Sequence, residues 1–71
     1  MDKEMQNFLE DLITLLQDKY NESLAEANTA FEQGRNFAYY DVLDLISSQL
    51  SVFGYEYHQD KPIVPEPGKP L

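Results

Sequence analysis

The residues of this 71-residue chain that could do chemistry are mainly carboxylates. Thirteen Asp and Glu stand against five Lys and Arg, which gives a formal net charge of −8. Glu4, Asp11, Asp18 and Glu22 recur at spacings that place them on one line of a helix, and we call this line the acidic ridge. A solvated ridge would keep the protein soluble. A row of carboxylates could instead imitate phosphates and occupy a nucleic-acid-binding protein.

The remaining residues offer no set for catalysis, metal binding or cofactor binding. The single histidine, His58, has no companion ligands, and the absence of cysteine excludes disulfides and thiolate zinc sites. No Ser or Thr stands beside a recognisable base. Gly34, Gly54 and Gly68 are isolated, so there is no glycine-rich phosphate loop. The sequence therefore predicts neither an enzyme nor a bound cofactor.

Charge and hydropathy also restrict partners and compartment. A strongly acidic chain lacks the basic face that direct nucleic-acid binding requires, and it is repelled by anionic membranes. No apolar run approaches the roughly 20 residues of a membrane span, and the first residues lack a signal-peptide pattern. A chain without cysteine fits a reducing compartment. We predict a cytoplasmic protein that contacts neither membrane nor nucleic acid.

The elements that carry the carboxylates begin with a long helix. Asp2 is a suitable N-cap, and Lys3 to Gln33 contains neither proline nor glycine. Apolar residues recur there at steps of three or four, as on one stripe of an amphipathic helix: Leu9, Ile13, Leu16, Tyr20, Leu24, Ala27 and Phe31.

Four further apolar residues widen this stripe in its first half: Met5, Phe8, Leu12 and Leu15. A single partner helix covers a narrower seam than this arc. The arc could be covered by the carboxyl-terminal segment, or it could meet a second copy of the chain. We favour the second copy, because a short two-helix chain covers a wide arc poorly.

A second helix is predicted over Phe37 to Phe53. Gly34 would end the first helix in a left-handed conformation, Asn36 would cap the second, and Gly54 would close it. Its apolar stripe consists of Tyr39, Leu43, Ile46, Leu50 and Phe53. Gln49 intrudes on the apolar arc, where it could hydrogen-bond across an interface or reach water.

One continuous helix through Gly34 is the alternative to this hairpin. It would cost about 1 kcal/mol for the glycine and would require a coiled coil of several chains. We favour the hairpin, because a continuous helix cannot bury both halves within one chain.

Residues Phe31 to Ile46 read F-x-x-G-R-x-x-A-Y-Y-x-V-L-x-L-I. This pattern resembles small uncharacterised helical proteins of phages and mobile elements of Gram-positive bacteria. The resemblance extends mainly over Phe31 to Gly54 and implies no enzymatic activity.

The chain after Gly54 changes character, with four prolines in its last ten residues. We predict an extended tail, which either stays inert or lies back along the helices through Tyr55, Tyr57, Ile63 and Val64. The predicted fold is an all-α antiparallel hairpin over 1–54 with an extended proline-rich tail over 55–71, forming a homodimeric four-helix bundle. The predicted function is a protein-interaction module, with an acidic mimic of nucleic acid as the alternative.

Overall fold

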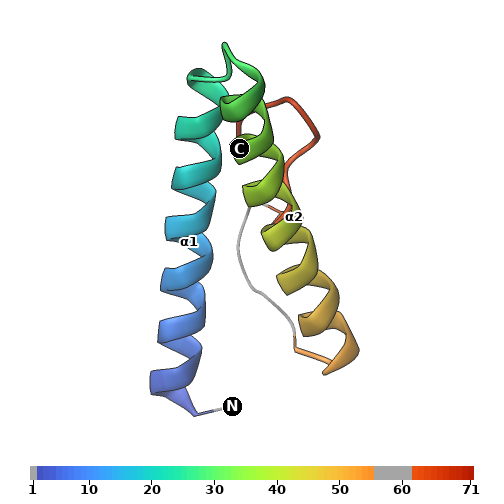
Figure 1. Ribbon diagram of the computed structural model, residues 1–71. Helices are drawn as coiled ribbons and strands as arrows, with labels where there is room; N and C mark the ends of the chain where they lie inside the picture. Colours follow the sequence, from blue (N-terminus) through green and yellow to red (C-terminus); the bar gives the residue numbers. More distant parts are fainter. Residues whose placement is uncertain (1, 56–61) are drawn as a thin grey trace.

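Two helices of equal length make up most of the molecule. The computed structural model describes residues 2–55 and 62–71, with α1 spanning Lys3–Ala25 and α2 spanning Ala30–Val52. The helices run in opposite directions and pack along their length (Figure 1). No strand occurs among the described residues. The predicted all-α hairpin is confirmed, and the single continuous helix is excluded.

The two outer helix ends follow the sequence signals. At the start of α1, the Met5 amide donates to the Asp2 carboxylate at 2.8 Å, as an N-cap requires. Gly54 follows α2 with φ 72°, and the Tyr55 amide donates to the Leu50 carbonyl at 2.9 Å. This bond satisfies a carbonyl that the helix end would leave free. The predicted roles of Asp2 and Gly54 are therefore confirmed.

The predicted turn at Gly34 and Asn36 is wrong. The helices are joined by residues 26–29, and Thr29 is the N-cap of α2, with its hydroxyl accepting from the Glu32 amide at 3.1 Å. Gly34 lies inside α2, and only Gly54 and Gly68 have positive φ among the described residues. The signal was the Thr-x-x-Glu sequence, which is typical of a helix start even where no glycine or proline interrupts the chain.

Asn36 has a different role from the predicted cap. Its side-chain amide donates from α2 to the Tyr20 carbonyl at 3.2 Å and to the Ser23 hydroxyl at 3.1 Å. Ser23 is fully buried, and its hydroxyl donates to the same Tyr20 carbonyl at 2.8 Å. These bonds connect the helices near the turn and satisfy polar groups that burial would otherwise make costly.

Arg35 fixes the connection from the outside. Its guanidinium donates to the Glu32 carboxylate at 2.8 Å and to the Glu26 carboxylate at 2.9 Å. The hydrogen bond to Glu32 raises the pKa of Arg35 above its ordinary value. Because Glu26 is the C-cap of α1 and Glu32 lies in the first turn of α2, Arg35 bridges the two helix ends.

The core lies between the helices and is small. Ile13, Tyr20 and Leu43 are completely buried. Partly buried side chains surround them: Leu9, Leu16, Leu24, Tyr39, Tyr40, Ile46, Leu50 and Ile63. The predicted stripe therefore forms the core as far as Leu24. Phe31 is 76% exposed, because it lies beyond the turn at the start of α2.

Candidate interaction face

The two flanks of the hairpin differ in what covers them. Residues 62–71, which we call the tail segment, return to α1 and in Figure 1 pass behind α2. Three α1 side chains receive the tail segment, and we call the flank that they form the covered face: Gln17, Tyr20 and Asn21. The sequence left open whether the tail returns to the helices, and residues 62–71 do so.

The hydrogen bonds of the covered face reach main-chain atoms of the tail segment. The Gln17 amide donates to the Ile63 carbonyl at 3.1 Å, and the Tyr20 hydroxyl donates to the Lys69 carbonyl at 2.8 Å. The Asn21 side chain makes two bonds with Leu71, accepting from its amide at 2.8 Å and donating to its carbonyl at 3.3 Å. Sequence reasoning missed this role for the three polar residues.

The composition of the tail segment explains this pattern. Proline has no N–H, so a chain with four prolines in ten residues offers mainly carbonyl acceptors. Amide and hydroxyl donors on α1 complement such a chain. Residues 66–69 form a β-turn in which the Lys69 amide donates to the Glu66 carbonyl at 3.0 Å, with Gly68 at φ 78°. The Glu-Pro-Gly-Lys sequence is a recognisable signal for such a turn.

The predicted apolar arc lies on the other flank of α1. At about 100° per residue, Gln17 and Asn21 fall on one side of the stripe, and the arc of Met5, Phe8, Leu12 and Leu15 falls on the opposite side. The tail segment therefore does not cover the arc. Phe8 is 62% exposed, Met5 and Leu15 are also exposed, and Leu12 is partly buried.

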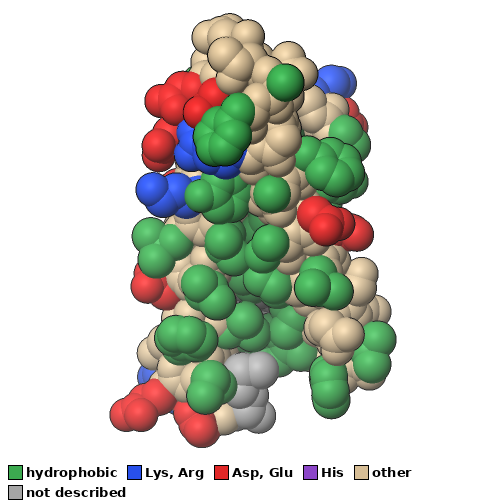
Figure 2. All heavy atoms as spheres, in the orientation of Figure 1, with side chains coloured by type: hydrophobic (Ala, Val, Ile, Leu, Met, Phe, Trp, Pro, Cys, Tyr) green, Lys and Arg blue, Asp and Glu red, His purple; other side chains and the backbone are tan. Residues whose placement is uncertain are grey.

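Exposed apolar residues of α2 extend this arc across the hairpin. Val42, Leu45 and Phe53 lie on the flank of α2 that faces the same way, and Phe53 is 81% exposed. We call the combined surface the open face; its residues are Met5, Phe8, Leu12, Leu15, Val42, Leu45 and Phe53. Figure 2 shows hydrophobic side chains over both helices on this side of the molecule.

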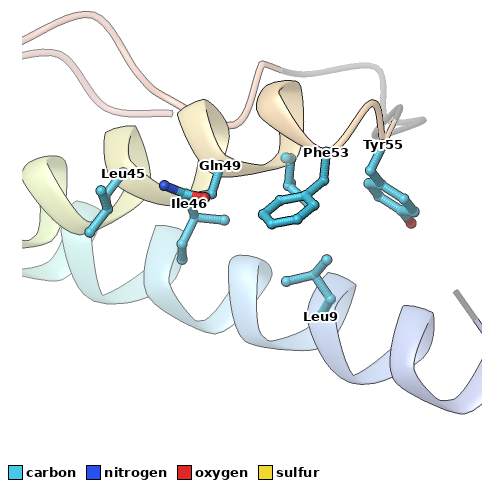
Figure 3. A pocket seen from close by; sticks show the side chains of 7 residues that line it. Leu9, Leu45, Ile46, Gln49, Phe53 and Tyr55 are labelled. Carbon is cyan, nitrogen blue, oxygen red and sulfur yellow. The ribbon is translucent and has the colours of Figure 1, made fainter.

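A groove of about 390 Å³ lies in the open face, between the start of α1 and the end of α2. Its lining consists of Leu9, Leu45, Ile46, Gln49, Leu50, Phe53 and Tyr55, and Figure 3 shows the side chains of both helices converging on it. The lining is almost wholly apolar, because Gln49 contributes mainly its aliphatic part. At one end, the buried Tyr55 hydroxyl has no hydrogen-bond partner among the described residues.

The acidic ridge is exposed over its whole length on α1. All four of its carboxylates reach solvent, and Glu22 lies 4.0 Å from the Lys19 ammonium. Acidic side chains are visible along the outer edge of α1 in Figure 2. The ridge therefore borders the open face without entering it.

Tyr57 and His58 lie outside the described residues. In the part of the chain that the structure describes, no three His, Asp or Glu side chains gather as a metal site requires. Neither α1 nor α2 is long and apolar enough to cross a membrane.

Comparison with family models, curated proteins and solved structures finds no match to this chain. The resemblance of Phe31 to Ile46 to phage and mobile-element proteins therefore stays a prediction.

Proposed function

We propose that this chain is a non-enzymatic protein-interaction module that binds through its open face. The observation that supports the proposal is the exposure of apolar residues from both helices on one side of the hairpin, around a groove. Soluble monomers rarely display large contiguous apolar patches, and such patches mark binding surfaces. The groove adds a hollow into which a partner's side chain can insert.

The partner in this proposal is a second copy of the chain, which completes a four-helix bundle. Burying one leucine or phenylalanine contributes about 1.5–3 kcal/mol, so several such side chains offset the cost of association. We place the module in the cytoplasm, because a chain without cysteine suits a reducing compartment. The resemblance of Phe31 to Ile46 supports an accessory or regulatory role in a phage or mobile element.

Sedimentation equilibrium of the full chain over a range of concentrations tests self-pairing. We expect the wild type to be dimeric and Phe8→Glu to be monomeric, because the new carboxylate would be buried without a partner. Asn7→Glu is the matched control, since it adds the same charge to an exposed neighbouring position on a different side of α1. A wild type that stays monomeric and still melts cooperatively would contradict self-pairing.

The acidic ridge supports a second candidate function, an inhibitor that occupies a basic nucleic-acid-binding protein. Replacing its four carboxylates by glutamine changes the net charge from −8 to −4 and should leave folding intact, since exposed charges contribute little to stability. A mimic would bind a basic DNA-binding protein in a strongly salt-dependent way, and the variant would lose that binding. Equal binding by wild type and variant would remove this candidate.

A further inference from the structure

The open face carries the features that determine how two copies would pair. We propose, resting on the self-pairing proposed above, that the two-fold axis runs parallel to the helices. In this dimer α1 of each copy lies over α2 of the other, both interhelical turns are at the same end, and Phe8 of each copy enters the groove of the other.

The groove and Phe8 lie at positions that can meet across a two-fold axis along the helices. A two-fold interface joins a surface to itself, so a projection on the surface must meet a hollow on the same surface. Leu9 and Phe53 both line the groove, so the start of α1 and the end of α2 lie at the same level. Phe8, next to Leu9, is the exposed aromatic residue of α1 at that level. A copy related by an axis along the helices places its Phe8 over the end of α2, where the groove opens.

Apolar residues of the two helices also lie at matching levels along the open face. The bonds of Asn36 to Tyr20 and Ser23 fix which residues of α1 and α2 are level with one another. At 1.5 Å per residue along each helix, Leu15 is then level with Leu43, close to the exposed Val42 and Leu45. The proposed pairing sets apolar residues against apolar residues at this level as well.

Electrostatic repulsion disfavours the other face-to-face arrangement. An axis running across the helices would lay α1 on α1 of the second copy, with the apolar arcs antiparallel. Both acidic ridges would then lie side by side along one edge of the dimer, and like charges at short range repel. An axis along the helices places the two ridges at opposite edges. With a net charge of −8 on each copy, this separation favours the proposed pairing.

Beyond the apolar region, the same arrangement leaves charged residues of both signs on the two helices that face each other. Lys19 continues the arc of α1 by one turn after Leu15, and Asp41 precedes Leu45 by one turn on α2. Both side chains are exposed, and they occupy nearly the same level of the hairpin. In the proposed dimer, Lys19 of one copy lies over the α2 helix that carries Asp41 in the other.

The exposed area is sufficient for a specific interface. Six of the open-face residues are between 41% and 81% exposed: Met5, Phe8, Leu15, Val42, Leu45 and Phe53. With side chains of their size, they offer about 600 Å² per copy, close to the roughly 800 Å² per partner of a standard interface.

Crosslinking tests the direction of the axis, because the natural chain has no cysteine to interfere. Glu4 and Val52 are exposed at nearly the same level, on the flanks of α1 and α2 that border the open face. Mixing Glu4→Cys protein with Val52→Cys protein and adding a short bis-maleimide should give a crosslinked heterodimer. Asp11→Cys protein alone should not crosslink, because the two ridges lie at opposite edges.

The outcomes separate this pairing from the proposed function. Crosslinking of Asp11→Cys with itself, or no crosslinking of the mixed pair in a protein that is dimeric by sedimentation, overturns the axis direction and leaves self-pairing intact. A wild type that is monomeric overturns both. As an independent readout, Phe8→Ala should weaken dimerisation by about tenfold or more, as loss of a central aromatic anchor does. An unchanged dissociation constant for Phe8→Ala would contradict the insertion of Phe8 into the groove.

Discussion

The covered face and the open face lie on the same two helices but are organised by different side chains. On the covered face, polar groups of Gln17, Tyr20 and Asn21 bond to the tail segment. On the open face, apolar side chains remain exposed around a groove, and Gln49 is the polar residue at its border. The tail segment therefore follows the donors of α1 rather than its widest apolar surface.

This difference has a physical cause. A proline-rich chain gains little from an apolar surface alone, because its main-chain carbonyls would lose water without gaining donors. The covered face supplies those donors and also accommodates Ile63 and the buried Pro65. A second helical chain satisfies its own main chain, so it can use a purely apolar surface. The two faces are thus suited to two kinds of partner.

We expect the largest difference in stability between variants of two aromatic residues, one on each face. Tyr20→Ala removes a fully buried ring, and such a change costs about 3–5 kcal/mol, as much as a core of this size supplies. We expect this variant to be largely unfolded by circular dichroism. Phe8→Ala, measured at concentrations where the chain is monomeric, should cost less than about 1 kcal/mol, because most of the ring is already in water. Equal losses would show that the two faces are not different in the monomer.

Asn36→Ala tests the polar side of the core. The change removes the donor that the Tyr20 carbonyl and the buried Ser23 hydroxyl share, and should cost about 1–3 kcal/mol. Urea denaturation measures this loss. Gln49→Ala is the open-face control and should change monomer stability by no more than about 0.5 kcal/mol, since Gln49 is exposed. A neutral Asn36→Ala would mean that these bonds contribute no net stability.

Much of the hairpin could be predicted because periodicity and capping act locally. The stripe from Leu9 to Leu24, the Asp2 cap and the Gly54 stop depend on residues a few positions apart, and all three are confirmed. The predicted turn is misplaced because Thr29, whose capping signal the prediction does not include, starts α2 before Gly34. A glycine inside a helix lowers helix stability by about 1 kcal/mol relative to alanine, and the packing of α2 can offset this loss.

The covered face was missed for a different reason. Its contacts join residues more than 40 positions apart, and no local pattern links Gln17 or Asn21 to the tail segment. A signal was present in the amide side chains beside the stripe, which are unusual neighbours for a core unless they have partners. Periodicity predicts the arc of Met5, Phe8, Leu12 and Leu15, of which Leu12 is partly buried and the other three are exposed, whereas the second copy stays a proposal.

A comparison of two glycines is expected to give a smaller effect of opposite sign. Gly34 has a helical backbone, and nothing lies within 4 Å of a Cβ placed there, so Gly34→Ala should stabilise the chain by about 0.5–1 kcal/mol. Gly54 has φ 72°, and Gly54→Ala should destabilise it by about 1–2 kcal/mol. Melting temperatures of the two variants should therefore move in opposite directions. A lower melting temperature for Gly34→Ala would contradict the position of Gly34 inside α2 and favour the turn that the sequence predicts there.

The smallest expected effect compares two tyrosine hydroxyls, one on each face. The Tyr20 hydroxyl donates to the Lys69 carbonyl, so Tyr20→Phe should cost about 0.5–1.5 kcal/mol. Loss of this bond should loosen the end of the tail segment and so increase hydrogen exchange at the Leu71 amide, which donates to Asn21. The Tyr55 hydroxyl is buried at the end of the groove without a partner among the described residues. Tyr55→Phe removes a donor that has lost its water, so it should be neutral or stabilise the chain by up to about 1 kcal/mol. Denaturation of both variants under the same conditions measures how much each hydroxyl contributes to the free energy of unfolding. A larger loss of stability for Tyr55→Phe than for Tyr20→Phe would contradict this prediction, because the Tyr55 hydroxyl would then make the stronger hydrogen bond.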